Sequence, residues 1–400
     1  MAEQTDVVVV GGGIVGTATA FHLAANGVET VLVDAEKEGS ATDAGAGIIS
    51  PSTSSRRENE DWYAFAVEAA AHYPTLVRRI EAQGIDDHGY RESDLLSVAV
   101  DADEVPAFEA DLERVQRRQE TPGGPSDDAF GEIDPATAAE AFPPLADVER
   151  AMRFSNAARV DGKRFTEGLR RAARRSGLTT FTGTVEEILV KTGAVSSVVV
   201  DAHGGTSRQQ QRTAGESECI DADRVVVAGG AWSAAFGEDL GLALPVEPIR
   251  GQIVHLDGAA TEAAAERDTD EWPIVGGYRD NYIVPWADGR MVVGATREEG
   301  VGFDPRITAG GVGEVLSAGL RLAPGLDDAT LEEIRVGLRP GSPDGLPVLG
   351  AVPDIEGAYV ATGHGPTGLM LGPYSGKVVA DLVRGEDPGV DLSAFAPDRF

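Results

Sequence analysis

Six residues near the start of the chain, Gly11-Gly12-Gly13-Ile14-Val15-Gly16, limit most strongly what the chain can fold into. They follow a β-branched run at 7–10 and precede an alanine-rich stretch of good helix formers at 14–26, which Gly27 is suited to cap. Residues 30–33 then repeat the strand pattern. A strand, a tight turn, a helix and a second strand within about thirty residues predict a parallel βαβ unit.

The spacing of these glycines is that of a dinucleotide-binding turn, G-x-G-x-x-G. At such a turn the missing side chains let backbone N–H groups and the positive end of a helix dipole meet a pyrophosphate. Asp34 ends the second strand roughly 20 residues on, where a carboxylate accepts a hydrogen bond from an adenosine ribose. The motif predicts a ligand with an ADP moiety, and it does not separate NAD from FAD.

The charge balance narrows the classes of partner. The chain has 34 basic and 66 acidic residues, a net charge of −32, which argues against nucleic-acid binding. Because the acidic excess is spread along the chain and costs compactness unless salt screens it, it indicates a halophilic protein; an ordinary acidic protein is the alternative. With six histidines in no ligand pattern and Cys219 as the single cysteine, we expect neither a disulfide framework nor a metal site.

The length and the hydropathy pattern predict the organisation and the location of the protein. Four hundred residues favour two lobes with a ligand cleft between them. Residues 1–6 carry no basic residue, and no unbroken apolar run reaches membrane-spanning length, so we expect a cytoplasmic protein without a transmembrane segment. An oligomer is compatible with the sequence.

Two patterns lie downstream of the βαβ unit. Alternating residues at 282–285 and 291–294, joined by a turn that contains Asp288-Gly289, predict an antiparallel hairpin. The polar segment 203–218, between β-rich runs at 195–200 and 224–228, is typical of a surface loop. The arginines at 170, 171, 174 and 175 have helical spacing and indicate a solvated helix face that pairs with carboxylates.

Several blocks resemble the D-amino acid oxidase-like FAD flavoproteins, and are nearest in pattern to their glycine oxidase and sarcosine oxidase-type members. The small-residue segment 39–51 matches first, followed in order by blocks at 227–233, 248–252, 282–285, 337–347 and 361–370. The resemblance implies an α/β plus α+β fold, with a Rossmann-type FAD domain that has a parallel central sheet and an antiparallel-sheet substrate domain. We assign 1–80, 150–245 and 325–400 to the FAD domain and 81–149 and 246–324 to the substrate domain.

The resemblance implies FAD as the cofactor, bound noncovalently because no cysteine falls near the C-terminal block. Its helix has Gly368, Gly372 and Gly376 on one face, and in the family the N-terminus of this helix points at the flavin. His364 either positions this block or contacts the flavin. Carried onto this sequence, the cofactor-binding residues are Gly11, Gly13, Ile14, Val15, Gly16, Asp34, Ala41, Thr42, Gly45, Ala46, Gly47, Ile48, Val185, Gly229, Trp232, His364, Gly365, Thr367, Gly368 and Leu369.

The resemblance also implies an activity. The family oxidises the C–N bond of a small amino acid, glycine or D-amino acid type, by hydride transfer from Cα to flavin N5, and water hydrolyses the resulting imine. Arg339 and Tyr282 match the residues that hold the substrate carboxylate. Oxygen or an unidentified redox partner accepts the electrons. Two alternatives stay open: oxidation of sarcosine, other N-methylated or cyclic amino acids, and a flavin-bearing electron-transfer subunit of a larger complex.

The chain departs from the glycine oxidase pattern at two positions. Pro366 stands where that enzyme carries an arginine, and Arg297 stands where it carries an apolar residue of the substrate pocket. Arg297 is therefore a third candidate for contact with the substrate. The alternative is that Arg297 turns outward and pairs with Glu298 or Glu299.

The acidic excess generates a prediction about stability. Because 66 acidic groups face 34 basic ones, we expect the thermal midpoint of unfolding to rise steeply between low and molar sodium or potassium chloride. Thermal melts at a series of salt concentrations measure it. Equal midpoints in low and high salt would contradict the halophilic interpretation.

Overall fold

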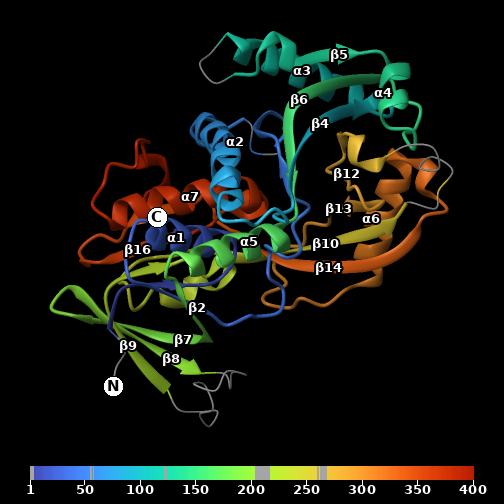
Figure 1. Ribbon diagram of the computed structural model, residues 1–400. Helices are drawn as coiled ribbons and strands as arrows, with labels where there is room; N and C mark the ends of the chain where they lie inside the picture. Colours follow the sequence, from blue (N-terminus) through green and yellow to red (C-terminus); the bar gives the residue numbers. More distant parts are fainter. Residues whose placement is uncertain are drawn as a thin grey trace.

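The computed structural model describes residues 4–54, 56, 58–120, 124–202, 217–258, 261 and 268–400. These residues form two sheets with helices packed on both (Figure 1). The α-helices are α1 (Ile14–Ala25), α2 (Glu60–Glu81), α3 (Val105–Gln119), α4 (Pro135–Ala141), α5 (Gly162–Arg175), α6 (Ala309–Leu322) and α7 (Gly368–Val383).

The first sheet contains the expected βαβ unit. Its strands are β1 (Gln4–Val10), β2 (Thr30–Asp34), β7 (Thr179–Lys191), β8 (Ala194–Ala202), β9 (Ser217–Val227), β15 (Val348–Ala351) and β16 (Ala358–Thr362). Strand β1 pairs in parallel with β2 and with β9, while β7 and β16 extend the parallel array on either side. Strand β8 pairs antiparallel with β7 and β9, and β15 closes the edge antiparallel to β16. Because the valines of β1 are buried on both faces, they form the centre of the sheet.

The second sheet is mostly antiparallel, in the order β14-β10-β13-β12-β11-β4-β6-β3, with β5 on β6. Its strands are β3 (Ile48–Ile49), β4 (Tyr90–Ala99), β5 (Phe130–Ile133), β6 (Arg150–Val160), β10 (Glu247–Asp257), β11 (Ile274–Gly277), β12 (Tyr282–Pro285), β13 (Arg290–Gly294) and β14 (Thr330–Gly341). The hairpin expected at 282–294 is β12 and β13.

Alternation along the strands of this sheet divides its two faces. Val254 and Val293 lie in the apolar cluster that includes residues of α6, whereas their neighbours Ile253 and Val292 lie in the cluster that includes residues of α3. Tyr282 packs against the second of these clusters. The period-two pattern therefore decides which side chains of the sheet reach the face on which Tyr282 lies.

Some strands of the second sheet come from ranges that the sequence analysis assigned to the FAD domain. Strands β3, β6 and β14 all belong to the second sheet, although their residues fall in the ranges 1–80, 150–245 and 325–400 assigned to the FAD domain. Of the loop expected at 203–218, only residues 217 and 218 lie within the described residues, and they begin β9. In the described part of the chain, no helix combines the length and the apolar character needed to cross a membrane.

Helices α1 and α7 pack closely because glycines of α7 face α1 (Figure 1). A Cβ added at Gly372 would come within 2.9 Å of the Ile14 side chain. One added at Gly376 would lie 2.7 Å from the backbone nitrogen of Thr19, which cannot move without its helix. These glycines set how closely the two helices approach, whereas Gly368, which the sequence places on the same face, has only the His364 side chain near it.

This packing predicts opposite effects for one substitution at two helical glycines. Gly376→Ala is expected to lower the free energy of unfolding by about 1–3 kcal/mol, because the added methyl meets backbone. Gly313→Ala, in the exposed interior of α6 with nothing within 4 Å, is expected to raise it by about 0.5–1 kcal/mol. Urea unfolding at one fixed salt concentration compares the two. A midpoint for Gly376→Ala equal to or above that of the original chain would refute the packing argument.

Candidate functional site

A cavity of about 620 Å³ lies where the first and second sheets meet. Its wall comes from the turn before α1, the end of β2, segment 40–48, α5, β7, the turn after β9, and the block that leads into α7. The residues expected to bind a cofactor that lie on this wall are Gly11, Gly13, Ile14, Val15, Asp34, Ala41, Thr42, Gly45, Ala46, Gly47, Ile48, Val185, Gly229, Trp232, His364, Gly365, Gly368 and Leu369. Tyr282 and Arg339 line the same cavity, whereas Gly16, Thr367 and Arg297 do not.

The glycine turn brings β1, α1 and the end of β9 into close contact. Gly11 has a φ of +103°, and a Cβ there would lie 2.5 Å from the carbonyl oxygen of Ala228. A Cβ at Gly16 would overlap the carbonyl oxygen of Gly11. Gly16 is therefore required for packing within the turn rather than as part of the cavity wall.

The N-terminus of α1 faces the cavity and carries the positive end of the helix dipole. Gly13, the N-cap, supplies no side-chain hydrogen bond, and the first turn contains no acidic residue. Within the described residues, the one side chain that accepts a hydrogen bond from a backbone N–H of this turn is Thr42, whose Oγ1 accepts from Ile14 at 3.0 Å. Such a helix end suits a phosphate group.

Asp34 lies beside a cation that the sequence analysis did not assign to the site. Arg170, on α5, donates from Nη2 to the carbonyl of Gly12 at 2.8 Å, and the same nitrogen lies 3.4 Å from Asp34 Oδ2. Arg170 lines the cavity. The interpretation of this arginine as part of a solvated helix face is thus wrong for Arg170: helix α5 packs against α1 and brings position 170 beside position 34.

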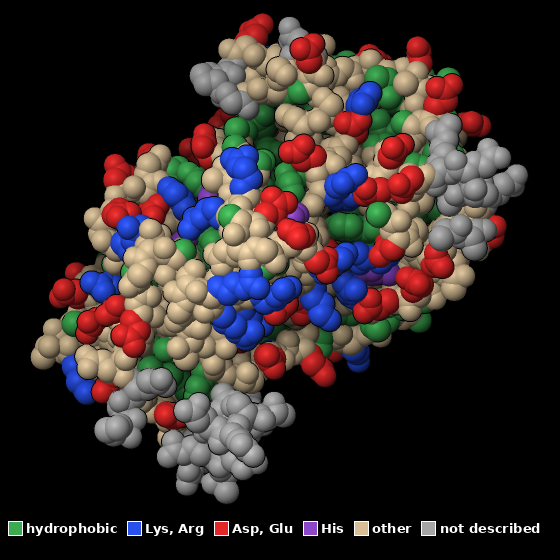
Figure 2. Space-filling model, in the orientation of Figure 1, with side chains coloured by type: hydrophobic (Ala, Val, Ile, Leu, Met, Phe, Trp, Pro, Cys, Tyr) green, Lys and Arg blue, Asp and Glu red, His purple; other side chains and the backbone are tan. Residues whose placement is uncertain are grey.

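Two lysines add positive charge to the cavity wall. Lys37 and Lys163 both line it, and Lys37 Nζ lies 5.5 Å from the centre of the Trp232 ring. Figure 2 shows Lys and Arg side chains gathered over α5, while Asp and Glu side chains are scattered over the rest of the visible face. The chain has only four lysines, so their scarcity was the signal in the sequence that could have drawn attention to these two.

The C-terminal block presents a second helix N-terminus to the cavity. Helix α7 begins at Gly368 and has no acidic residue in its first turn. The His364 ring is buried, and its Nε2 lies 2.9 Å from Ser375 Oγ on the same helix. Burial lowers the pKa of His364 to about 4, so the ring is neutral at pH 7. Thr367 does not line the cavity; its hydroxyl donates a hydrogen bond to the carbonyl oxygen of His364.

Arg339 and Tyr282 come together from two strands of the second sheet. A Cβ on Gly251 would overlap the Arg339 guanidinium, and one on Gly294 would overlap the Tyr282 ring, so glycines make room for both. Burial lowers the pKa of Arg339 and raises that of Tyr282. Arg339 Nη1 donates to the carbonyl of Thr296 at 2.9 Å, and within the described residues no carboxylate forms an ion pair with it.

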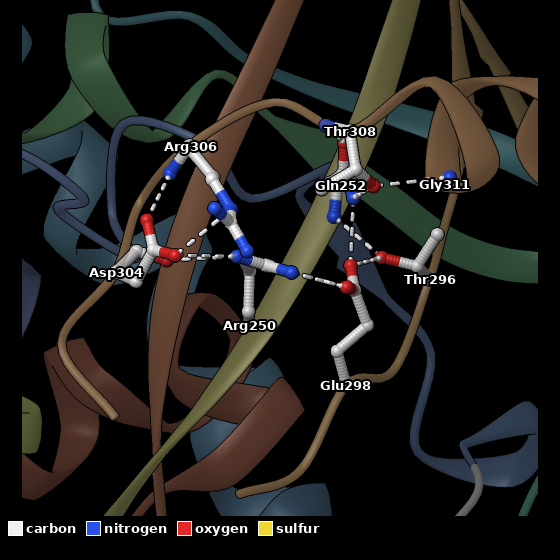
Figure 3. A network of polar contacts seen from close by, with 8 residues as sticks. All are labelled: Arg250, Gln252, Thr296, Glu298, Asp304, Arg306, Thr308 and Gly311. Atoms are coloured by element: carbon white, nitrogen blue, oxygen red, sulfur yellow. Dashed lines mark hydrogen bonds and ion pairs between the residues drawn. The ribbon is translucent and has the colours of Figure 1, made fainter. Parts of the chain in front are cut away.

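A polar network behind Arg339 holds the segment that supplies this carbonyl (Figure 3). Thr296 Oγ1 donates to Glu298 Oε1 at 2.9 Å and accepts from the Gln252 backbone nitrogen at 2.9 Å. The buried Arg250 donates to Glu298 Oε2 at 2.6 Å and to the Asp304 carbonyl at 3.2 Å. The hydrogen bond from Arg250 lowers the pKa of Glu298 to about 2. Glu298 is therefore ionised at neutral pH and fixes Thr296.

Arg297 extends from this segment toward solvent. Its side chain is 46% exposed, and its Nε lies 3.4 Å from Glu299 Oε1. Of the two placements that the sequence left open, this one corresponds to the outward pair with Glu299. Arg297 still influences the site, because its charge contributes to lowering the pKa of Arg339.

Comparison with known proteins identifies the family. Residues 6–382 match the family model described as FAD dependent oxidoreductase (DAO). The chain belongs to this family. It is 38% identical to an uncharacterized oxidoreductase, YurR, of Bacillus subtilis, over 98% of each chain, and 32% identical to glycine oxidase of Pseudomonas putida, over 100% of this chain and 99% of that one. Iminodiacetate oxidase from Chelativorans has a structure with a TM-score of 0.86 and 35% identity, covering 98% of each chain.

The cavity fits the FAD on which this family depends. Two helix N-termini without acidic residues open into it, and glycines keep side chains away from the turn at 11–13. Residues on the wall near α1 and Asp34 would hold the ADP part, and those near α7 would hold the flavin. Cys219 is exposed on β9 and is not part of the cavity wall.

The position of Asp34 predicts its contribution to cofactor affinity. Asp34→Ala is expected to weaken FAD binding by about 1.5–3 kcal/mol, because a charged acceptor is lost at the end of β2. Flavin titration of the apoprotein measures the dissociation constant. Asp328→Ala, which changes an exposed carboxylate outside the cavity, is the control. Unchanged affinity in Asp34→Ala would contradict its assignment to the ADP site.

Proposed function

We propose that this FAD-dependent oxidoreductase oxidises the C–N bond of a small amino acid bound through its carboxylate. The observation that carries the proposal is Arg339, a partly buried, desolvated guanidinium on the cavity wall without a carboxylate partner among the described residues. A desolvated cation of this kind favours an anion, and a guanidinium meets both oxygens of a carboxylate at once. The similarity to glycine oxidases and to iminodiacetate oxidase supports an amino-acid substrate.

The residues of this chain perform binding and orientation. Arg339 holds the substrate carboxylate, and the Tyr282 hydroxyl beside it, kept protonated by its raised pKa, donates a hydrogen bond to the same group. The polar network behind Thr296 keeps Arg339 in place. Bound FAD supplies the two-electron acceptor that takes the hydride from Cα.

Proton transfer needs no side chain of the site. His364, the histidine on the cavity wall, is turned to Ser375 and neutral at pH 7, so we assign it no role as a base. The substrate amine therefore enters unprotonated, and its nitrogen lone pair forms the C=N bond as the hydride leaves. Water then hydrolyses the imine to an oxo acid and an amine.

A substrate with a secondary amine is the second candidate. Pro366 replaces an arginine at a position where glycine oxidase carries one, and Pro366 lines the cavity, so the wall there offers no charged side chain. The likeness to iminodiacetate oxidase, whose name describes a secondary amine, favours this candidate. Sarcosine and cyclic amino acids belong to the same class.

Anaerobic reduction of the flavin tests the proposal. Purified holoprotein in high salt is expected to lose its flavin absorbance with at least one member of a panel of glycine, sarcosine, iminodiacetate, proline and D- and L-amino acids. Bleaching by none of these would instead favour a flavin-bearing electron-transfer subunit. Peroxide release in air, measured on the same protein, separates an oxidase from a dehydrogenase.

Substitution of Arg339 tests how the substrate is held. Arg339→Met is expected to lower kcat/KM for the best substrate by about 30-fold or more, on the scale of 2–5 kcal/mol for an unpaired buried charge. Arg339→Lys should recover part of this loss. Arg117→Met removes an arginine whose side chain is 71% exposed on α3 and is the control. A loss below threefold in Arg339→Met, with FAD content intact, would place the carboxylate elsewhere.

A further inference from the structure

One side of helix α5 forms part of the cavity wall. Four of its residues, spaced three and four apart on that side, line the cavity: Lys163, Thr166, Glu167 and Arg170. The other arginines of the run, Arg171, Arg174 and Arg175, are exposed and do not line it. Of the four arginines that the sequence places on one helix, Arg170 is therefore the one that can act on a ligand in the cavity.

The start of α5 packs closely on other parts of the same wall. A Cβ added to Gly162, the first residue of the helix, would overlap the carbonyl oxygen of Thr42 and lie 2.8 Å from the Leu369 side chain. Asp161 caps the helix, since its Oδ1 accepts from the backbone nitrogen of Arg164 at 3.1 Å. Helix α5 also packs against α1. These contacts fix the direction of α5, and with it the position of residue 170.

Arg170 joins the glycine turn to the end of β2. Its Nη2 donates to the Gly12 carbonyl at 2.8 Å and lies 3.4 Å from Asp34 Oδ2. The side chains of Arg170 and Asp34 are 19% and 29% exposed, so the pair is partly shielded from water. Glu36 and Glu167 line the cavity too, but within the described residues neither forms an ion pair with Arg170. Asp34 is thus the carboxylate that Arg170 holds.

Gly12 leaves the space in which this contact forms. A Cβ there would overlap Asp34 Oδ2 and lie 2.8 Å from Arg170 Nη2. The spacing G-x-G-x-x-G leaves this position open to any residue, so the dinucleotide motif does not explain a glycine here. The contact does explain it, because the Gly12 carbonyl accepts from Arg170 and the missing side chain makes room for the Asp34 carboxylate.

We propose that Arg170 is a positioning residue for the cofactor, which holds the Asp34 carboxylate against the glycine turn so that it can accept from the adenosine ribose of FAD. A carboxylate that is fixed before the ligand arrives loses less freedom on binding, so the affinity for the AMP half of FAD rises. FMN lacks the AMP half and gains nothing from this contact. Arg170 therefore helps the site to select FAD over FMN, whatever the substrate is.

A comparison of FAD with FMN tests this role. The apoprotein is titrated with each flavin at one fixed high salt concentration, and the change in flavin fluorescence gives the two dissociation constants. Arg170→Met is expected to raise the dissociation constant of FAD by about five- to tenfold and that of FMN by less than about twofold. Arg170→Lys, which keeps the charge and a hydrogen-bond donor, should recover part of the loss. Arg171→Met, on the exposed side of the same helix, is the matched control and should change neither constant.

A double-mutant cycle separates the positioning of Asp34 from direct contact with the phosphates of FAD. In the Asp34→Ala background, Arg170→Met is expected to raise the dissociation constant of FAD by less than about twofold, because the residue through which it acts is gone. Gly12→Ala reaches the same contact from the other side, since the added methyl displaces the Asp34 carboxylate. It should weaken FAD more than FMN, and it should lose most of this effect in the Asp34→Ala background. If Arg170→Met does not fold, Gly12→Ala in the two backgrounds provides the comparison.

Three results would overturn the proposal. An equal loss of affinity for FAD and FMN in Arg170→Met would give Arg170 a structural role only, and unchanged affinity for FAD would show that Asp34 does not need it. A loss for FAD that persists in full in the Asp34→Ala background would mean that Arg170 contacts the cofactor directly. Thermal melts of each apoprotein at the same salt concentration show whether a variant is folded. These outcomes do not depend on the proposed function, because none of the measurements uses a substrate.

Discussion

The structure depends on the absence of Cβ atoms where β1, α1, β9 and α7 meet. Gly11 and Gly16 let the turn fold against Ala228, and Gly376 lets α7 lie against the backbone of α1. Because these contacts involve backbone atoms, no rearrangement of side chains could replace them. Their result is functional as well as structural: the N-termini of α1 and α7 open into one cavity, where they can act on the two ends of one FAD molecule.

The charge on the cavity wall is more evenly balanced than that of the whole chain. The chain is strongly acidic, yet the wall carries the basic side chains of Lys37, Lys163, Arg170 and Arg339 beside the acidic ones of Asp34, Glu36, Asp43 and Glu167. Basic side chains on the wall of a cavity in a negative protein favour the binding of anions there. Both the cofactor and the proposed substrate are anions, so the same electrostatic arrangement serves both.

The second sheet positions the side chain of Arg339 through hydrogen bonds. Arg339 donates a hydrogen bond to the carbonyl of Thr296, so its position depends on that of Thr296. Thr296 is held in turn by Gln252 and Glu298 (Figure 3). The low pKa of Glu298 keeps these hydrogen bonds intact at neutral pH. A partly buried guanidinium that is positioned in this way needs little reorganisation when a carboxylate arrives.

The sequence by itself determined the parallel βαβ unit, the glycine turn and Asp34 at the end of β2, because each of these depends on local backbone geometry or on a motif of fixed spacing. That Tyr282 and Arg339 share one site was implied by the family resemblance, and both line the cavity. Tertiary structure decided the rest. Arg170 reaches Asp34 because α5 packs against α1, beside the end of β2. Gly16 and Thr367 lie in the expected motifs but not on the cavity wall, and Arg297 points outward to Glu299. Periodicity and motif spacing describe neighbours along the chain, whereas Arg170 and Asp34 lie far apart in sequence, and only the packing of whole elements brings them together.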